Sequence, residues 1–428
     1  MRLDATTARR ELGAADRGDR TKGGHFPCFD GLRAFAALTV VGVHTSFVSG
    51  LTLRNSTLGR YTSRLEIGVE VFFVISGFLL YRPFALAHFR GQAPPPARRF
   101  WVRRLKRIIP AYWVAFVFLT YVLRANTGGP GWKGPLVYLG FAQIYFPTYA
   151  LHGVSQAWSL CTEMTFYLMV PLYAAAVGWA GRRLASQLRV ELAGLATLTA
   201  ISFAFRIPVL PAAYRDGMLH HNGHVVQVMP NWLPAYLDQF ALGMLLAVGS
   251  AYLAHRDSRP SWLWHPALPW VSWLLALVCF GAVGNIGLPL VPLVPSDLGL
   301  SLARQTLYGL FAFFAVLPAV FGAQDRGAIR ALLRWRPLVL IGIVSYGVYL
   351  WHEGFIHMYL VWTGDHLFNI PWLHLTFVIG GLAVAAATAS YVLVERPILR
   401  HGRPTLPQEL ELQQRMPGRR WSRLLEAR

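Results

Sequence analysis

Ten apolar stretches, each long enough to cross a bilayer as a helix, constrain this chain more than any other feature. They lie at about 31–52, 66–88, 108–125, 156–180, 190–207, 232–254, 266–286, 300–323, 337–362 and 372–394. A spanning helix needs about 20 predominantly apolar residues. Only 14% of the 428 residues are charged, against about 25% in soluble domains. The sequence therefore predicts an all-α polytopic membrane protein with about ten transmembrane helices in contact with the lipid bilayer.

The positive charge of the chain follows its predicted loops. Thirty-one of the 40 lysines and arginines fall in segments on one side of the membrane, and eight fall in loops and helix ends on the other. Basic residues are enriched in cytosolic loops, so both termini are predicted to be cytosolic. A formal net charge of +20 is then explained by topology, and no nucleic-acid partner is expected.

One further apolar segment, 136–151, is short and contains Pro147. An additional span here would invert every later loop, so the segment is predicted to be re-entrant or interfacial, as backbone covered by protein tolerates. Around the transmembrane domain at 29–400 we expect a cytosolic basic arm at 1–28 and a cytosolic basic tail at 401–428.

No metal site is expected from this sequence. The three cysteines are far apart in the chain, which favours neither a disulfide framework nor a zinc site. One predicted outside loop holds His220, His221 and His224, but no matched cysteine or carboxylate set accompanies them.

The first span carries ionisable residues that need an explanation. Arg33 and His44 are eleven residues apart, which places them on one helix stripe about 16 Å apart along the axis, with Asp30 close to the same stripe. Ionisable side chains within a span usually mark function. The alternative is a packing histidine with a snorkelling arginine.

A basic run, RRFWVRRLKRIIPAYW, precedes the third span and is predicted to be an inside loop. Arg104 and Arg107 are i,i+3 neighbours on one helix face, and Arg103 is i,i+4 from Arg107. Arginine offers planar bidentate donors to phosphate oxygens, which indicates a phosphate site. A topological anchor is the alternative.

Two further spans carry polar residues at helical spacing, in the segments WSLCTEMTFY and SYGVYLWHE. Each set shares one helix face, at i, i+4, i+8 in the first and i, i+4, i+7 in the second. A single stripe can serve only to hold helices together, whereas several stripes favour a shared polar interior. The two sets are Ser159, Glu163 and Tyr167, and Ser345, Tyr349 and His352.

These motifs resemble acyltransferase family 3, the polytopic membrane enzymes that O-acylate bacterial surface glycans, lipids and macrolide sugars. The matching segments are FDGLRAFAALTVVGVH, GVEVFFVISGFLL, RRLKRIIPAYW, WSLCTEMTFY, SYGVYLWH and LVERPILR. They occur in the order typical of the family from residue 29 to about 400. The resemblance implies a multi-pass protein of a bacterial plasma membrane, and it matches Arg33, His44, Arg104, Arg107 and Glu163 to the family's motif residues.

The resemblance and the residues together lead to one functional hypothesis. An acyl group, most simply acetyl, moves from cytosolic acyl-CoA as co-substrate to a hydroxyl of a glycan, glycolipid or secondary metabolite. His44 is predicted to be the general base, a role suited to histidine near neutral pH, and Glu163 is the second predicted catalytic residue. Arg33, Arg104 and Arg107 are predicted to bind the donor. The residues predicted to bind the acceptor or support the site are Asp30, Ser159, Tyr349 and His352.

Three alternatives stay open at this point. A covalent acyl-histidine intermediate is a variant of the mechanism. A transporter or exporter would use the same intramembrane histidine, glutamate and arginine side chains as a proton or substrate pathway. A sensor or scaffold without turnover would not need the aligned arginine and histidine of the first span.

Overall fold

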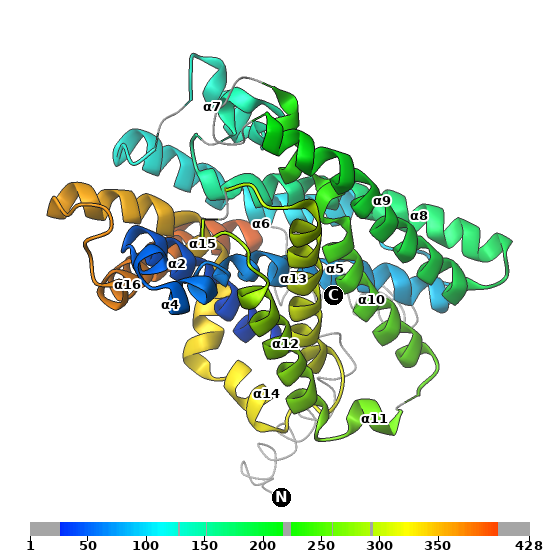
Figure 1. Cartoon of the computed structure of the whole chain (residues 1–428). Helices are drawn as coiled ribbons and strands as arrows, with labels where there is room; N and C mark the ends of the chain where they lie inside the picture. The colour runs from blue at the N-terminus through cyan, green and yellow to red at the C-terminus, as the bar shows by residue number, and fades with distance from the viewer. Residues whose placement is uncertain are drawn as a thin grey trace, which may run out of the picture. The chain divides into compact units, whose positions relative to one another are not determined.

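The computed structural model describes residues 26–126, 129–150, 152–216, 224–258, 260–291 and 294–400 (Figure 1). Contacts divide the chain into Met1–Pro27 with Arg400–Arg428 and a helical unit, Cys28–Leu399. The predicted cytosolic arm and tail lie almost wholly outside the described residues. The account below concerns the helical unit.

Ten helices in the described residues are long and apolar enough to cross a membrane, and no strand occurs there. This confirms the predicted fold class. The helices are α2 Phe29–Val48, α5 Gly68–Phe89, α6 Ala97–Val117, α8 Trp158–Arg183, α9 Gln187–Arg215, α10 Leu237–His255, α12 Leu268–Asn285, α13 Leu298–Val320, α15 Arg336–Thr363 and α16 Trp372–Ser390.

Short elements make up most of the connections. The segment 136–150 folds into short helices and not into an additional long one, as expected from its length and Pro147. The short helices are α3 Leu51–Arg54, α4 Ser56–Thr62, η1 Leu65–Ile67, η2 Phe118–Val122, α7 Lys133–Leu139, η3 Gln143–Tyr145, η4 Pro147–Tyr149, η5 Ser155–Ala157, η6 Val225–Gln227, η7 Met229–Asn231, η8 Leu233–Tyr236, α11 Ser261–Trp264, α14 Ala328–Leu333, η9 Tyr391–Glu395 and α17 Arg396–Arg400.

One boundary differs from the sequence prediction. The basic run before the third span is not a loop, because α6 begins at Ala97, directly after Pro96. A proline at a helix start needs no N–H donor, and arginine, leucine and lysine have high helix propensity. Arg104 and Arg107 are therefore fixed on a regular helix that continues into the membrane-spanning segment.

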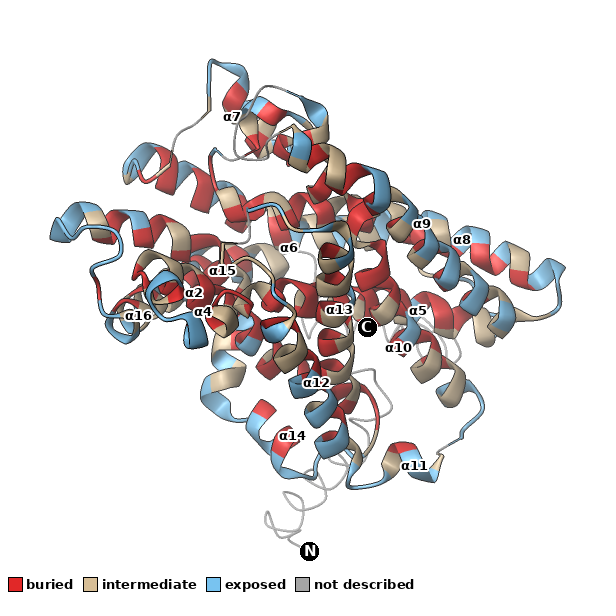
Figure 2. Cartoon of the chain, in the orientation of Figure 1, coloured by how far each residue is buried: buried red, intermediate tan, exposed pale blue. Residues whose placement is uncertain are grey.

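The helices differ in how deeply they are buried (Figure 2). In α2, α5 and α15 67% of the most apolar window is buried, against 28% in α9 and 22% in α16. Since the surrounding lipid is itself apolar, the exposed apolar side chains of the outer helices are expected to face lipid. Two of the helices that carry polar stripes, α2 and α15, are thus among the most buried of the unit.

Small residues bring two central helices into backbone contact. A Cβ added at Gly77 of α5 would lie 2.3 Å from the carbonyl oxygen of Phe240 in α10, and one at Gly243 would lie 2.0 Å from that of Val74. Close approach at small residues is the usual way in which membrane helices pack tightly. α5 and α10 are thereby held as one rigid pair.

Candidate active site

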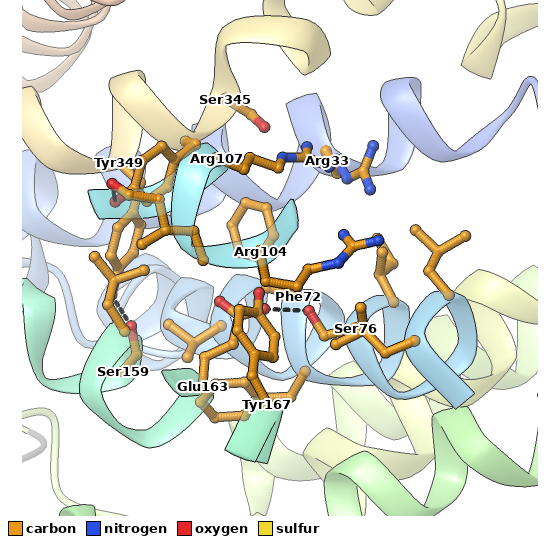
Figure 3. Close-up of a pocket in the computed structure, with 18 residues that line it drawn as sticks. Arg33, Phe72, Ser76, Arg104, Arg107, Ser159, Glu163, Tyr167, Ser345 and Tyr349 are labelled. Carbon is orange, nitrogen blue, oxygen red and sulfur yellow. Dashed lines mark hydrogen bonds between the residues drawn. The ribbon is translucent and has the colours of Figure 1, made fainter. Parts of the chain in front are cut away.

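Four of the polar stripes predicted from sequence meet at one cavity (Figure 3). Its polar and charged lining comes from α2, α5, α6, α8 and α15. These residues are Arg33, Ser76, Arg104, Arg107, Ser159, Glu163, Tyr167, Ser345, Tyr346 and Tyr349. We call this space the arginine cavity.

Of the three arginines that line the cavity, Arg33 forms a salt bridge. Arg33 Nη1 donates a 2.9 Å hydrogen bond to Asp30 Oδ1, one turn earlier on α2. Within the described part of the chain, no carboxylate lies within ion-pair distance of Arg104 or Arg107. The arrangement therefore offers several planar cations to a ligand that carries phosphate groups.

Glu163 enters the same cavity from α8. Its carboxylate accepts a hydrogen bond from the Ser76 hydroxyl of α5, and it interacts electrostatically with Arg104 (Figure 3). The structure thus groups Glu163 with the arginines, and no hydrogen bond joins it to His44 among the described side chains.

Tyr349 forms one wall of the cavity and links α15 to α8. Its hydroxyl donates to the carbonyl oxygen of Gln156 at 2.8 Å and lies 2.8 Å from Ser159 Oγ. The Gln156 side chain in turn donates to the carbonyl oxygens of Tyr349 and Leu350, at 3.1 and 2.9 Å. These bonds fix the start of α8 against the middle of α15.

Beyond Tyr349, two histidines form a pair. His44 Nδ1 of α2 lies 2.7 Å from His352 Nε2 of α15, and the two rings stack with their centroids 5.0 Å apart. His352 is fully buried, whereas His44 is partly exposed. Of the two histidines, His44 is therefore the one that a substrate can reach.

The hydrogen bonds assign the protons of this pair when both rings are neutral. His352 Nδ1 lies 2.8 Å from the carbonyl oxygen of Tyr349, which can only accept, so Nδ1 carries the proton. His352 Nε2 must then accept from His44 Nδ1, and the lone pair of His44 is left on Nε2. The main-chain carbonyl of Tyr349 thus orients both rings of the histidine pair, so that the basic nitrogen, His44 Nε2, is free to accept a proton.

A carboxylate that the sequence analysis did not select lies beside the histidine pair. Glu353 of α15 interacts electrostatically with His44 and His352. Ser155 Oγ donates to its Oε2 at 2.5 Å. A signal for it was present, because Ser345, Tyr349 and Glu353 recur at i, i+4, i+8 as the α8 stripe does.

A second missed carboxylate is Glu395, in the segment quoted above as LVERPILR. It is buried at the end of η9, a π-helical segment, and interacts electrostatically with Arg107 and Tyr346. π-Helical turns often occur at functional sites. No hydrophobic periodicity points to it, since the π turn shifts the register of the helix face.

The structure thus brings most predicted residues together, but in two groups. The donor-site arginines, Glu163, Ser159 and Tyr349 line the arginine cavity. His44 and His352 form the pair beyond it, and Asp30 contacts Arg33. The roles assigned to these residues remain predictions.

The histidine-rich loop contributes little to this picture. His220 and His221 lie outside the described residues, and His224 is exposed, 3.0 Å from Asp216 Oδ2. Across the described ranges, no group of three or more histidine, cysteine, aspartate or glutamate side chains is arranged to hold a metal ion.

Comparison with known proteins points to one family. Residues 26–392 match the family model of an acyltransferase domain, acyltransferase family 3. The chain is 26% identical over 398 residues to a putative peptidoglycan O-acetyltransferase, YrhL, of Bacillus subtilis, covering 88% of this chain and 55% of the relative. It is 24% identical over 395 residues to the O-acetyltransferase OatA of Staphylococcus aureus, covering 88% of this chain and 58% of the relative.

A shorter match extends the comparison. Over 162 residues the chain is 27% identical to the peptidoglycan O-acetyltransferase OatA of Listeria monocytogenes, covering 35% of this chain and 24% of the relative. The chain therefore spans little more than half the length of the first two relatives. No solved structure matches it.

Proposed function

The chain belongs to acyltransferase family 3, and from this membership we propose that it transfers an acyl group, most simply acetyl, from acyl-CoA to a hydroxyl of a glycan or glycolipid. The relatives are named for O-acetyl transfer, two of them to peptidoglycan. The location is the plasma membrane of a bacterium, with the terminal segments 1–28 and 401–428 in the cytosol.

The single observation that carries the proposal is the convergence of Arg33, Arg104 and Arg107 on one cavity. A cation within a membrane protein is costly unless a partner or ligand compensates it. Acyl-CoA supplies phosphates that bind guanidinium groups bidentately. The donor nucleotide is thus bound by the arginines, and its thin pantetheine arm extends past Tyr349 towards the histidines.

His44 is the general base of the proposed reaction. Its Nε2 takes the proton of the acceptor hydroxyl as the oxygen attacks the thioester carbon. The carbon–sulfur bond then breaks, and the proton passes to the thiolate of CoA. Such assistance typically gives about 10²–10⁴-fold in rate. A covalent acyl-histidine is the variant, distinguished by trapping labelled protein with donor alone.

The positions of the two groups also suggest how the substrates arrive. Arg33 lies near the start of α2, and Arg104 and Arg107 lie seven and ten residues after the start of α6; the charge distribution assigns both helix starts to the cytosol. His44 is fifteen residues after Phe29, the first residue of α2, which corresponds to about 22 Å along the helix axis. Donor and acceptor therefore approach from opposite faces, and the acyl group crosses most of the bilayer within the protein.

Oriented vesicles test this proposal. With acetyl-CoA supplied only at the cytosolic face and disaccharide muropeptides only at the other face, we expect release of CoA thiol and labelled ester on the muropeptide. If no acceptor gives thiol release, the proposal that the protein is an acyltransferase is contradicted, and the transporter hypothesis is favoured. Turnover only when both substrates share one face would reject the transmembrane route alone.

A further inference from the structure

The carboxylate of Glu353 is fixed by local hydrogen bonds in a position that faces the histidine pair. Ser155 Oγ donates to Oε2 at 2.5 Å, and the backbone N–H of Gln156 donates to the same carboxylate. Gln156 is itself bonded to the main chain of α15 at Tyr349 and Leu350. The carboxylate therefore cannot turn away without breaking contacts between η5 and α15.

The charge of Glu353 acts on the two histidines and on Tyr349. His44 and His352 both interact with it electrostatically. Among the described residues, no arginine or lysine forms an ion pair with Glu353. Glu163, the other glutamate of the site, is instead bonded to Ser76 and interacts with Arg104 in the arginine cavity.

The proposed reaction creates a charge at the same place. When His44 Nε2 takes the acceptor proton, the ring becomes an imidazolium that still donates from Nδ1 to His352. His352 is fully buried, and its Nδ1 proton is bonded to a main-chain carbonyl. Its ring therefore stays neutral and supplies no negative charge to the imidazolium. In a low-dielectric interior, a fixed carboxylate nearby stabilises such a cation strongly.

We propose that Glu353 is a positioning residue whose carboxylate supplies the negative charge that stabilises the His44 imidazolium during acyl transfer. The inference rests on the proposed function and deepens it. The acceptor O–H bond breaks, a carbon–oxygen bond forms, the carbon–sulfur bond breaks, and the proton held on His44 goes to the CoA sulfur. Glu353 stays ionised throughout and exchanges no proton. The aspartate of a serine-hydrolase triad likewise stabilises an imidazolium without becoming protonated.

The test compares Glu353→Gln, Glu353→Asp and Ser155→Ala with wild type in reconstituted vesicles, using acetyl-CoA and disaccharide muropeptides. We expect Glu353→Gln to lower kcat roughly 10- to 100-fold with little change in KM for acetyl-CoA, because the lost interaction exists only in the transition state. Glu353→Asp keeps the charge and should regain most of the rate. Ser155→Ala keeps the carboxylate and should lose less than Glu353→Gln.

Controls separate this inference from the function itself. Binding of CoA by calorimetry and the melting temperature are expected to match wild type in all three variants. Wild-type kcat in Glu353→Gln, or equal losses in Glu353→Gln and Glu353→Asp, would overturn the inference while leaving the enzyme in place. If His44→Ala measured alongside also turns over normally, His44 is not the base and the inference fails with it, whereas absence of thiol release by wild type would contradict the proposed function itself.

Discussion

Two regions of the spanning helices neutralise the charge of arginine differently. In α9, Arg206 Nη2 donates to Asp238 Oδ2 of α10 at 2.7 Å, and both side chains are buried. Ser202 adds a 3.0 Å bond to the other carboxylate oxygen. In the arginine cavity, Arg104 and Arg107 have no carboxylate within salt-bridge distance among the described residues, and Glu163 and Glu395 interact with them only electrostatically.

The difference separates a structural use of arginine from a functional one. A buried pair compensates its own charge and needs no ligand, so Arg206 and Asp238 serve to fix α9 against α10. A guanidinium that lines a cavity and has no salt-bridged carboxylate gains most when an anion enters. Composition and spacing alone do not distinguish these cases, whereas a salt bridge to a carboxylate on the facing helix does.

The largest effect that would sharpen this comparison is expected at the histidine pair beyond the arginine cavity. His44→Ala should lower kcat by about 10²–10⁴-fold because it removes the general base, while the melting temperature stays close to wild type. The measurement is thiol release from acetyl-CoA by purified protein in vesicles. Wild-type turnover in this variant would remove His44 from the mechanism.

Substitutions in the Arg206–Asp238 pair should change the free energy of unfolding. Asp238→Asn leaves Arg206 buried without its counter-charge, which should cost about 3–5 kcal/mol, whereas an Arg206→Met, Asp238→Leu double variant should be close to neutral. Unfolding in mixed detergent micelles measures both. A single variant as stable as wild type, or a folded variant with altered KM for acetyl-CoA, would contradict the structural assignment.

The arginines of the cavity should respond in binding. Arg104→Ala and Arg107→Ala each remove hydrogen bonds to a charged ligand, worth about 1.5–3 kcal/mol, so the Kd for CoA should rise roughly 10- to 100-fold. Lys106→Ala is the matched control, since Lys106 is exposed on the same helix. A loss of kcat with unchanged Kd would argue against phosphate binding.

Labelling of single cysteines should show on which membrane face the loops lie. These substitutions are expected to have almost no effect on activity. Single cysteines at Gln92 and Arg326 are expected to react from the cytosolic side, and those at Thr57 and Asp365 only from outside. The native cysteines are buried, and burial raises the pKa of Cys28 to about 11, so background reaction at neutral pH should be low. Labelling of Gln92 from outside would refute the assigned orientation.

The sequence contained more information on the fold than on the site. The ten spans follow from apolar length, and the α8 stripe follows from helical periodicity, because both are properties of one segment. The contact between His44 and His352 depends on how α2 and α15 are rotated against each other, which no single segment specifies. Glu353 was not predicted from the sequence, although its spacing of four residues from Tyr349 matches the helical repeat.

Tyr349 presents its ring to the arginine cavity, and its main-chain carbonyl accepts the hydrogen bond of His352 Nδ1. Because this carbonyl belongs to the main chain, a replacement of the side chain that preserves the helix keeps the acceptor for His352 Nδ1. Donor selectivity and base chemistry are therefore separable under mutation. An engineer who wishes to admit bulkier acyl groups can start at position 349, where the shape of the cavity changes and the proton on His352 stays in place.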